Sequence, residues 1–451
     1  MPAVDVVVIG AGLSGLTAAL AAAESGARVQ VLAKGHAGTH WGTGGLDVAA
    51  VPEATTPRAG IRKLASMPGH PYAVLGEDVA PALDWLRTVL AARGLAYEGD
   101  LDSPLAVVPT SIGGTRPAAI LPAAQAAALG PWGSGERLIV CGVAGFKDFW
   151  PDQIAASLAR PAIWAGRPGP AAVEAVQVEL PDLEGRHNLS AVEISNRFDR
   201  PAWRRLAIDR IVAALESRAL AGGAPGRVAL PAVFGLDDHA AVFDELRRRL
   251  PLAPFELPLV PPSVPGMRLY RALRAAFVAA GGRIQIGELV DSVERDGRRV
   301  TAVATEAASR SHATRTGAVV LATGGIASGG IVGDQSGHLS EVVLDLPVEA
   351  PAFADWLAQD EFDPGGHPLE AAGIRTDAEL RPTDAAGRPL FDNVRVAGTL
   401  LAGQRNLHER CRDGVDLASG WRAARNLTGA AARGPGAPVG AASGGAGSNR
   451  S

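Results

Sequence analysis

The sequence predicts an α/β fold in which separate stretches of chain build one nucleotide-binding unit around a shared sheet. Three observations support this prediction. An apolar strand, a glycine-rich turn and an alanine-rich helix occupy residues 4–24, and a second apolar strand ending in glycines lies at residues 316–325. A further strand at residues 390–403 is followed by a helix at residues 413–427. The long region between the first two stretches is expected to form an inserted α/β cap domain.

The first stretch predicts a strand, a helix and a second strand. Residues 4–10 (VDVVVIG) form a continuous apolar run bounded by glycine, which is typical of a parallel strand buried on both faces. Helix-forming residues occupy 14–24, Gly26 ends the helix, and RVQVLA at residues 28–33 predicts the second strand. This βαβ unit has the length that a dinucleotide-binding fold requires.

The turn after the first strand carries the pattern GxGxxG, and each glycine has a physical task. Gly10 permits the tight turn, Gly12 lets the backbone approach a pyrophosphate, and Gly15 lets the helix and strand pack closely. Leu13 and Ser14 lie at the N-terminus of the helix. The free N–H groups and partial positive charge of a helix N-terminus favour a phosphate. The turn therefore predicts a phosphate-bearing ligand.

The position after the second strand lacks the acid that dinucleotide sites normally carry. In those sites an Asp or Glu accepts hydrogen bonds from the ribose of the adenosine half. Here Ala33 and Lys34 occupy that place. The pattern predicts a nucleotide site but leaves the identity of the nucleotide open.

Composition changes and proline-rich connections predict where the units begin and end. Strand and helix patterns at residues 135–149 and 226–250 belong to the inserted unit, and the connection at residues 251–266 ends it. Two alternating runs joined across Asp296-Gly297 predict a hairpin beyond it. The predicted boundaries are 1–69 for the first part of the nucleotide-binding unit, 70–264 for the inserted cap, 265–430 for the return part and 431–451 for a disordered tail.

The composition argues against several classes of function. A net charge of −4 gives no basic surplus for nucleic acid. The two cysteines, Cys141 and Cys411, stand far apart, and the nine histidines show no paired spacing, so we expect no iron–sulfur cluster and no metal site within this chain. No secretory signal is expected, and no apolar run reaches the about 18–20 residues of a membrane span. We expect a cytoplasmic protein, peripheral at the inner face of the membrane only through a partner subunit.

Motifs outside the glycine turn narrow the assignment. The arrangement of the N-terminal and return segments resembles flavoproteins of the glutathione-reductase and fumarate-reductase type. Five further motifs stand in order, namely HPYAVLG (70–76), LIVCGVAGFKDF (138–149), LPAVFGL (230–236), PPSVPGMRL (261–269) and TDAELRP (376–382). Together they are similar to the B subunits of anaerobic glycerol-3-phosphate dehydrogenases, over nearly the whole chain except the tail. The resemblance implies a Rossmann-like two-dinucleotide-binding-domain flavoprotein with a discontinuous nucleotide-binding domain.

This resemblance also implies an activity and partners. In that three-subunit respiratory enzyme, glycerol 3-phosphate is oxidised to dihydroxyacetone phosphate and the electrons pass to quinone. The A subunit carries FAD, and the C subunit brings iron–sulfur clusters and the membrane attachment. Two alternatives remain open: a self-sufficient FAD-dependent oxidoreductase, resembling fumarate reductase or a 3-ketosteroid dehydrogenase, and a non-catalytic assembly subunit.

The family resemblance gives the missing acid an interpretation. The B subunit carries a flavin described as FMN, which has no adenosine half, so nothing would be left for a ribose carboxylate to hold. The first expectation is therefore FMN. The alternative is FAD held without that contact, and a third interpretation is NADP selected by Lys34.

The resemblance further implies which residues contact the flavin. The loop at residues 39–50 would lie against the isoalloxazine ring, where Gly44 and Gly45 permit close approach and Thr43 offers a hydroxyl. Besides the glycine turn, Ala33 and Lys34, the remaining candidates are Thr323, Gly324, Gly398, Gly414 and Val415. The segment before the last helix departs from the glycine-rich pattern of the family, because it carries Glu409, Arg410, Arg412 and Asp413.

Four residues are candidates for substrate chemistry. Glycerol 3-phosphate is a dianion, so an arginine near the flavin is expected, and Arg268 and Arg381 lie in family-like motifs. His70 and His367 are acid–base candidates because imidazole titrates near neutrality. Each of the four also has an ordinary structural interpretation.

Overall fold

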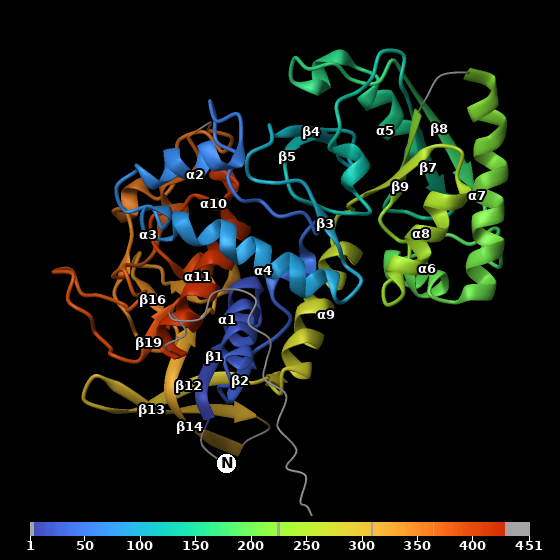
Figure 1. The fold of residues 1–451 in the computed structure, drawn as a ribbon. Coiled ribbons are helices and arrows are strands. Elements are labelled where there is room, and N and C mark those ends of the chain that lie inside the picture. The colour runs from blue at the N-terminus through green and yellow to red at the C-terminus, as the bar shows by residue number, and fades with distance from the viewer. Residues whose placement is uncertain (1–3, 223–225, 308–309, 364, 429–451) are drawn as a thin grey trace, which may run out of the picture.

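The computed structural model describes residues 4–222, 226–307, 310–363 and 365–428. Two α/β units lie beside each other, each with its own sheet and its own buried core (Figure 1). The predicted tail at residues 431–451 lies outside the described residues.

The first unit is built on a seven-stranded sheet with the order β11-β2-β1-β14-β13-β12, and β19 also pairs with β14. Its parallel strands are β1 (Val4–Ile9), β2 (Val29–Ala33), β11 (Arg283–Ile286), the second half of β14 (Arg310–Leu321) and β19 (Val394–Val396). The central strands are apolar because both faces of a parallel sheet are covered. The sheet therefore joins the N-terminal and return segments, and the predicted discontinuous α/β fold is confirmed.

An antiparallel ribbon extends this sheet. Strands β12 (Leu289–Asp296) and β13 (Arg299–Ala307) form the predicted hairpin, in which Asp296 pairs with Arg299 across the turn. Strand β14 pairs antiparallel with β13 in its first half and parallel with β1 from Thr316 onward. One long strand thus links the ribbon to the parallel sheet.

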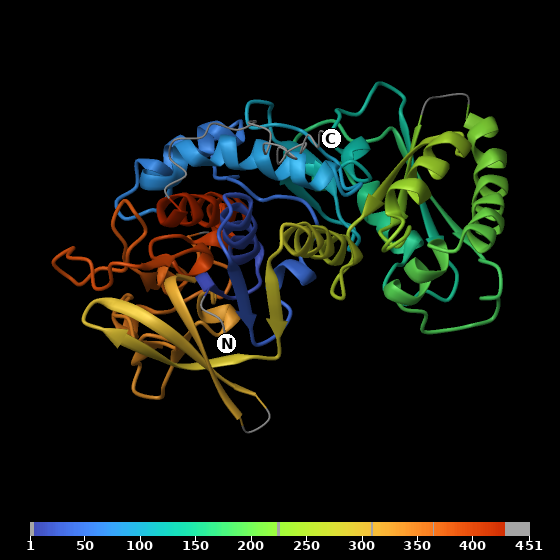
Figure 2. The same ribbon diagram turned by 60° about the horizontal axis from the view of Figure 1, so that its bottom comes forward.

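Helices cover one face of the parallel strands, and the ribbon lies on the other side (Figure 2). Helix α1 (Leu13–Glu24) packs between α9 (Val264–Ala279) and α11 (Arg412–Thr428). The small side chains of α1 make this close packing possible, because most of its alanines are buried. Helices α2 (Pro57–Ala65), α3 (Tyr72–Leu75), α4 (Val79–Ala91) and α10 (Asn406–Glu409) complete the first unit.

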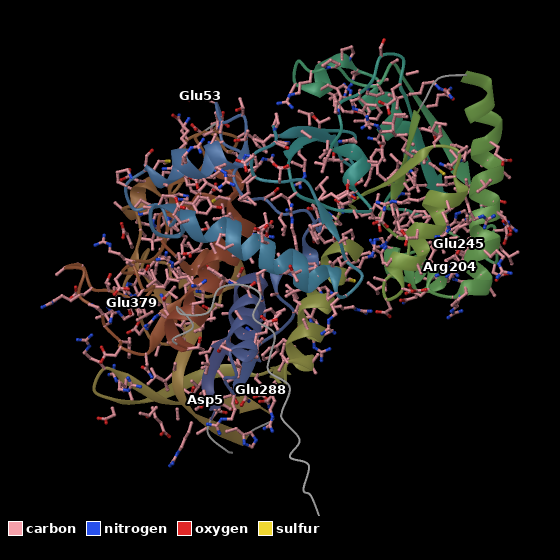
Figure 3. All side chains as sticks on the ribbon, in the orientation of Figure 1. Asp5, Glu53, Arg204, Glu245, Glu288 and Glu379 are labelled. Carbon is pink, nitrogen blue, oxygen red and sulfur yellow. The ribbon has the colours of Figure 1, made fainter. Side chains whose placement is uncertain are left out.

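The second unit contains a four-stranded, fully parallel sheet with the order β10-β9-β7-β8. Its strands are β7 (Arg137–Val143), β8 (Ala172–Val178), β9 (Gly226–Pro231) and β10 (Ala253–Leu257), and its helices are α5 (Pro151–Leu158), α6 (Ala191–Phe198), α7 (Pro201–Gly222) and α8 (His239–Arg249). A 3.0 Å ion pair between Arg204 and Glu245 joins α7 to α8 (Figure 3). This unit is the inserted α/β cap that the sequence predicts.

Along the sequence, the boundary between the two cores lies after residue 70, which is the predicted start of the cap. Helices α3 and α4 pack against α11, and their buried residues, such as Leu86, belong to the core of the first unit. That core continues to Leu105 and also includes Ala119 and Ile120, while the core of the second unit begins at Val108. The apolar faces of these helices cover the nucleotide-binding unit rather than the cap.

The remaining strands form short two-stranded pairs. They are β3 (Tyr97–Glu98) with β6 (Leu121–Pro122), β4 (Ala106–Pro109) with β5 (Thr115–Ala118), β15 (Ile331–Gly333) with β16 (Leu339–Glu341), and β17 (Val348–Glu349) with β18 (Gly373–Ile374). Along the part of the chain that the structure describes, no helix is both long and apolar enough to cross a membrane.

Candidate functional site

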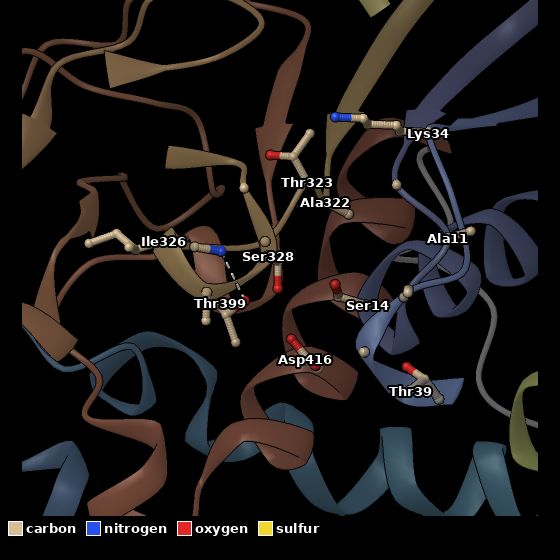
Figure 4. Close-up of a pocket in the computed structure, with 18 of the residues that line it drawn as sticks. Ala11, Ser14, Lys34, Thr39, Ala322, Thr323, Ile326, Ser328, Thr399 and Asp416 are labelled. Carbon is tan, nitrogen blue, oxygen red and sulfur yellow. Dashed lines mark hydrogen bonds between the residues drawn. The ribbon is translucent and has the colours of Figure 1, made fainter. Parts of the chain in front are cut away.

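A cavity of about 1010 Å³ lies at the carboxyl ends of the parallel strands of the first unit (Figure 4). Its walls come from the segments that follow β1, β2, β11 and β14, and from the first turns of α11. Ligands of open α/β sheets bind at this edge, because helix N-termini and strand ends converge there.

The turn after β1 holds its shape only with glycine at two positions. Gly10 has a φ of +111°, and a Cβ there would lie 2.1 Å from the carbonyl oxygen of Ala322. A Cβ on Gly15 would lie 2.1 Å from the carbonyl oxygen of Gly10. Gly12 differs, because its φ is −74° and a Cβ would meet nothing nearer than the side chain of Ala37 at 3.5 Å. Gly12 thus leaves the N-terminus of α1 accessible from the cavity without being required for packing.

The first turn of α1 is prepared for an anion. Gly12 is the N-cap and makes no side-chain cap hydrogen bond, and the first turn carries no acidic residue. The N–H groups of this turn have no partner inside the helix and are directed along its axis. A phosphate in the cavity would satisfy them.

Two oxygen-bearing side chains lie together beside this turn. A Cβ on Gly398 would lie 2.4 Å from the Ser14 hydroxyl and 2.6 Å from a carboxylate oxygen of Asp416, so both side chains use the space that this glycine leaves free (Figure 4). Burial raises the pKa of the Asp416 carboxyl to about 7, and the nearby Arg412 opposes the shift. Asp416 is therefore partly protonated near neutrality, next to the helix N-terminus.

A second glycine turn closes the cavity after β14. Gly324 has a φ of +82°, and the N–H of Gly325 donates to the Thr399 hydroxyl at 3.1 Å (Figure 4). Within the described residues, the buried Thr323 hydroxyl and one buried carboxylate oxygen of Glu288 have no hydrogen-bond partner. Both residues line the cavity. Unpaired polar atoms beside two glycine turns, one of which opens onto the N-terminus of α1, fit a polar nucleotide cofactor.

Comparisons with known proteins agree with this geometry. A family model described as FAD binding domain matches residues 5–411. The B subunit of a probable anaerobic glycerol-3-phosphate dehydrogenase from Halobacterium salinarum is 33% identical over 436 residues, covering 93% of this chain and 96% of that protein. The chain belongs to this B-subunit family. A second member, from Yersinia enterocolitica, is 31% identical over 446 residues, covering 94% of this chain and 98% of that protein.

The family assignment from the sequence motifs is thereby confirmed, as is the flavoprotein class of the fold. Among solved structures, an open conformation of a flavocytochrome c3 fumarate reductase is 11% identical, with a TM-score of 0.44, covering 95% of this chain and 79% of that one.

Many of the residues predicted for this B-subunit site line the cavity. They are Gly10, Gly12, Leu13, Ser14, Ala33, Lys34, Thr323, Gly324 and His367. The imidazole Nδ1 of His367 accepts a hydrogen bond from the backbone N–H of Ala358 at 3.1 Å. In the neutral ring this contact leaves the proton on Nε2. His367 therefore presents a donor rather than an acceptor.

The loop after β2 lies outside the cavity walls from Thr43 onward. The Thr43 carbonyl accepts from the Gln125 side chain at 2.9 Å, and the Gly44 carbonyl accepts from the Tyr97 hydroxyl at 2.5 Å. A Cβ on Gly45 would lie 2.7 Å from the side chain of Leu121. This part of the loop holds the two units together.

The start of α11 also differs in detail from the predicted contacts. A Cβ on Gly414 would lie 2.1 Å from the Tyr72 hydroxyl, and Val415 is fully buried, so these two residues pack into the protein. Arg412 and Asp416 line the cavity instead. The neighbouring Asp413 carboxylate accepts from the Arg412 guanidinium at 3.2 Å and raises its pKa.

Three of the four substrate candidates have charged partners in the protein. The buried His70 accepts from the backbone N–H of Tyr72 at 3.0 Å, and its Nε2 lies 3.3 Å from a carboxylate oxygen of Glu409. Arg381 pairs with Asp377 at 2.7 Å. Neither His70 nor Arg381 lines the cavity.

Arg268 is the third, and it too is buried and lies outside the cavity walls. Its guanidinium donates to both carboxylate oxygens of Glu256, at 2.6 and 3.0 Å, and to the Gly235 carbonyl at 2.7 Å. Both side chains of the ion pair are buried. Its charge is therefore neutralised between α9 and β10.

Sequence reasoning missed Glu288 and Asp416. The alternating apolar residues of RIQIG (283–287) are typical of a strand, and Glu288 follows them directly, so the rule that ligand-binding residues follow parallel strands points to it. Asp416 sits within a helical pattern, where the sequence gives no signal that one carboxylate faces a cavity.

Proposed function

We propose that this chain is a flavin-containing subunit that takes part in the oxidation of glycerol 3-phosphate to dihydroxyacetone phosphate. The observation that carries this proposal is a phosphate-ready cavity in a chain that matches both the FAD binding domain model and the B subunits along most of its length. The bound flavin would supply an acceptor for two electrons from the substrate carbon.

FAD is the flavin we favour. The sequence alone places FMN first, because Ala33 replaces the ribose acid. The cavity nevertheless continues beyond Ala33 to Glu288 and Val290, which gives space for an adenosine half. The matching family model is also that of an FAD binding domain.

The residues at the cavity wall suggest how substrate is held. Arg412 is fixed by Asp413 and brings a guanidinium to the wall, where it can bind the phosphate of glycerol 3-phosphate through two N–H groups. His367 offers its Nε2 proton to a substrate oxygen. Arg268 and Arg381 we assign to structure, because their charges already have partners. His70 we also assign to structure, because it is buried outside the cavity walls, where its Nδ1 accepts from the backbone N–H of Tyr72.

Electrons must then leave this chain. Both cysteines are buried, and the name of the family describes one subunit of a larger enzyme. We propose an FAD-containing A subunit and an iron–sulfur, membrane-anchoring C subunit as partners, with quinone as the final acceptor. Exposed apolar side chains among the cavity-lining residues, Trp41, Leu357 and Leu407, form a rim suited to a protein partner.

Two measurements test the proposal. The released cofactor of the purified chain is identified by mass spectrometry, and FAD is expected. Turnover of glycerol 3-phosphate with an artificial electron acceptor is then compared with and without the A subunit. Turnover that requires this chain supports the proposal. A chain that binds no flavin, or a complex that works equally well without it, would refute the catalytic role and favour an assembly subunit.

A further inference from the structure

Glu288 lies beside the end of β2, where Ala33 stands in place of the acid that dinucleotide sites normally carry. We propose that its carboxylate accepts hydrogen bonds from the ribose hydroxyls of the adenosine half of FAD. In dinucleotide-binding folds the acid after β2 usually makes this contact. This inference rests on the proposed flavin function. It replaces the interpretation that Ala33 signals a ligand without adenosine.

Backbone geometry brings Glu288 to the end of β2. Strand β11 runs parallel to β2, with Ile286 paired to Ala33 at their last residues. The N–H groups of Gly287 and Glu288 then both donate to the Ala33 carbonyl, at 2.9 and 3.1 Å. The chain thus turns across the end of β2, and Glu288 lies one strand away from the position where the acid is missing. In Figure 3, Glu288 is labelled in the lower part of the first unit, away from the cap.

Among the residues that the structure describes, one oxygen of the Glu288 carboxylate has no hydrogen-bond partner. That oxygen is fully shielded, and within the described ranges no hydrogen bond or ion pair reaches it, including from Lys34. A shielded carboxylate oxygen without a donor is unfavourable unless a ligand supplies one. Two ribose hydroxyls offer two donors to two carboxylate oxygens.

The residues next to Glu288 suit the rest of the adenosine. Leu289 and Val290 follow it into β12 and also line the cavity. Their apolar side chains can contact the adenine base, while Glu288 holds the ribose. At the other end of the cavity, the turns at Gly12 and Gly324 remain available for the pyrophosphate and the flavin.

The test compares FAD and FMN affinities of the apo-protein by flavin fluorescence titration. Glu288→Gln keeps the shape of the side chain and removes its charge, so we expect FAD to bind about 10- to 100-fold more weakly. FMN affinity should change by less than about twofold, because FMN does not reach this part of the cavity. Glu294→Gln is the matched control, since Glu294 is an exposed residue of β12 outside the cavity walls. The thermal unfolding midpoint of each apo-variant verifies folding.

The outcomes separate this inference from the proposed function. Wild-type protein that binds neither flavin refutes both. Wild-type protein that binds only FMN, or binds FAD with an affinity that Glu288→Gln leaves unchanged or lowers equally for FMN, refutes the role of Glu288 alone. Recovery of FAD affinity in the double variant A33E/E288Q would be direct support, because it returns the carboxylate to the end of β2.

Discussion

The buried ion pair between Arg268 and Glu256 gives the sharpest test of whether a charged motif residue acts in structure or in catalysis. Arg268 lies on α9, which joins the two units, and Glu256 lies on β10 of the cap. The side chains are 4% and 0% exposed. Glu256 also accepts from the backbone N–H of Phe234 at 3.2 Å. Replacing Arg268 by methionine would leave the Glu256 charge buried with that neutral donor.

The magnitude follows from the burial. Removing one partner of a buried ion pair costs about 3 to 5 kcal/mol, because the remaining charge is uncompensated. The total stability of a protein is about 5 to 15 kcal/mol, so R268M should lose a large part of it. Arg271 provides a control one turn along α9, since it pairs with Asp237 and both side chains are exposed, at 48% and 70%. R271Q should cost at most about 1 kcal/mol.

Equilibrium urea unfolding measures both variants. Tryptophan fluorescence reports on both units, because Trp164 and Trp203 belong to the core of the cap and Trp421 to the core of the first unit. The double variant R268M/E256L should regain much of the loss, since it removes both charges together. An R268M variant as stable as R271Q would refute the structural assignment. So would an R268M variant of normal stability that had lost turnover, because that result would return Arg268 to the reaction.

Three further outcomes are expected. Gly10→Ala should destabilise the apo-protein by about 3 kcal/mol or more in urea unfolding, because the new Cβ would strike the Ala322 carbonyl at a positive φ. Gly12→Ala should cost at most about 1 kcal/mol in the same assay. It should nevertheless weaken FAD binding at least about tenfold. FAD affinity, measured by titration from pH 6 to 8, should fall as Asp416, with a pKa near 7, becomes charged beside the phosphate site, and Asp416→Asn should remove this dependence. Burial, and then the nearby arginine, lower the pKa of His239 to about 4. As the pH falls, His239 is therefore protonated in the unfolded chain before it is protonated in the folded protein. The free energy of unfolding should decline by up to about 3 kcal/mol as the pH falls from about 6.5 to 4. The decline should be smaller in the H239Q variant, which lacks this imidazole.

The sequence predicted the frame of the nucleotide site because its signals are local. The apolar run, the glycine turn and the second strand at residues 4–33 match β1, α1 and β2 closely, and the hairpin across Asp296-Gly297 forms as predicted. The position of β11 beside β2 depends instead on how strands far apart in the chain pair. No local pattern states that Ile286 lies next to Ala33, so the carboxylate at that edge was not found.

The extent of the cap was also beyond local signals. The amphipathic helix α4 would fit either unit, because its buried face shows only that it packs against something apolar. Its neighbours α9 and α11 come from distant parts of the chain. The packing of α4 against these two helices places the residues up to Leu105 in the core of the first unit.

The candidates for chemistry divide by whether the fold already supplies a partner. Arg268 and Arg381 were chosen because their charge suits a phosphate, yet each charge is already paired with a carboxylate. Thr323 was predicted only as a flavin contact and Glu288 was not predicted at all. Each nevertheless keeps a buried oxygen unpaired among the described residues. An unpaired buried polar atom costs about 1 to 3 kcal/mol, and a bound ligand removes that cost. Substituting a paired residue should therefore lower the free energy of unfolding, while substituting an unpaired one should lower ligand affinity and leave the apo-protein equally or more stable. R268M and E288Q should accordingly fail in opposite assays, and finding both defects in one variant would contradict this division.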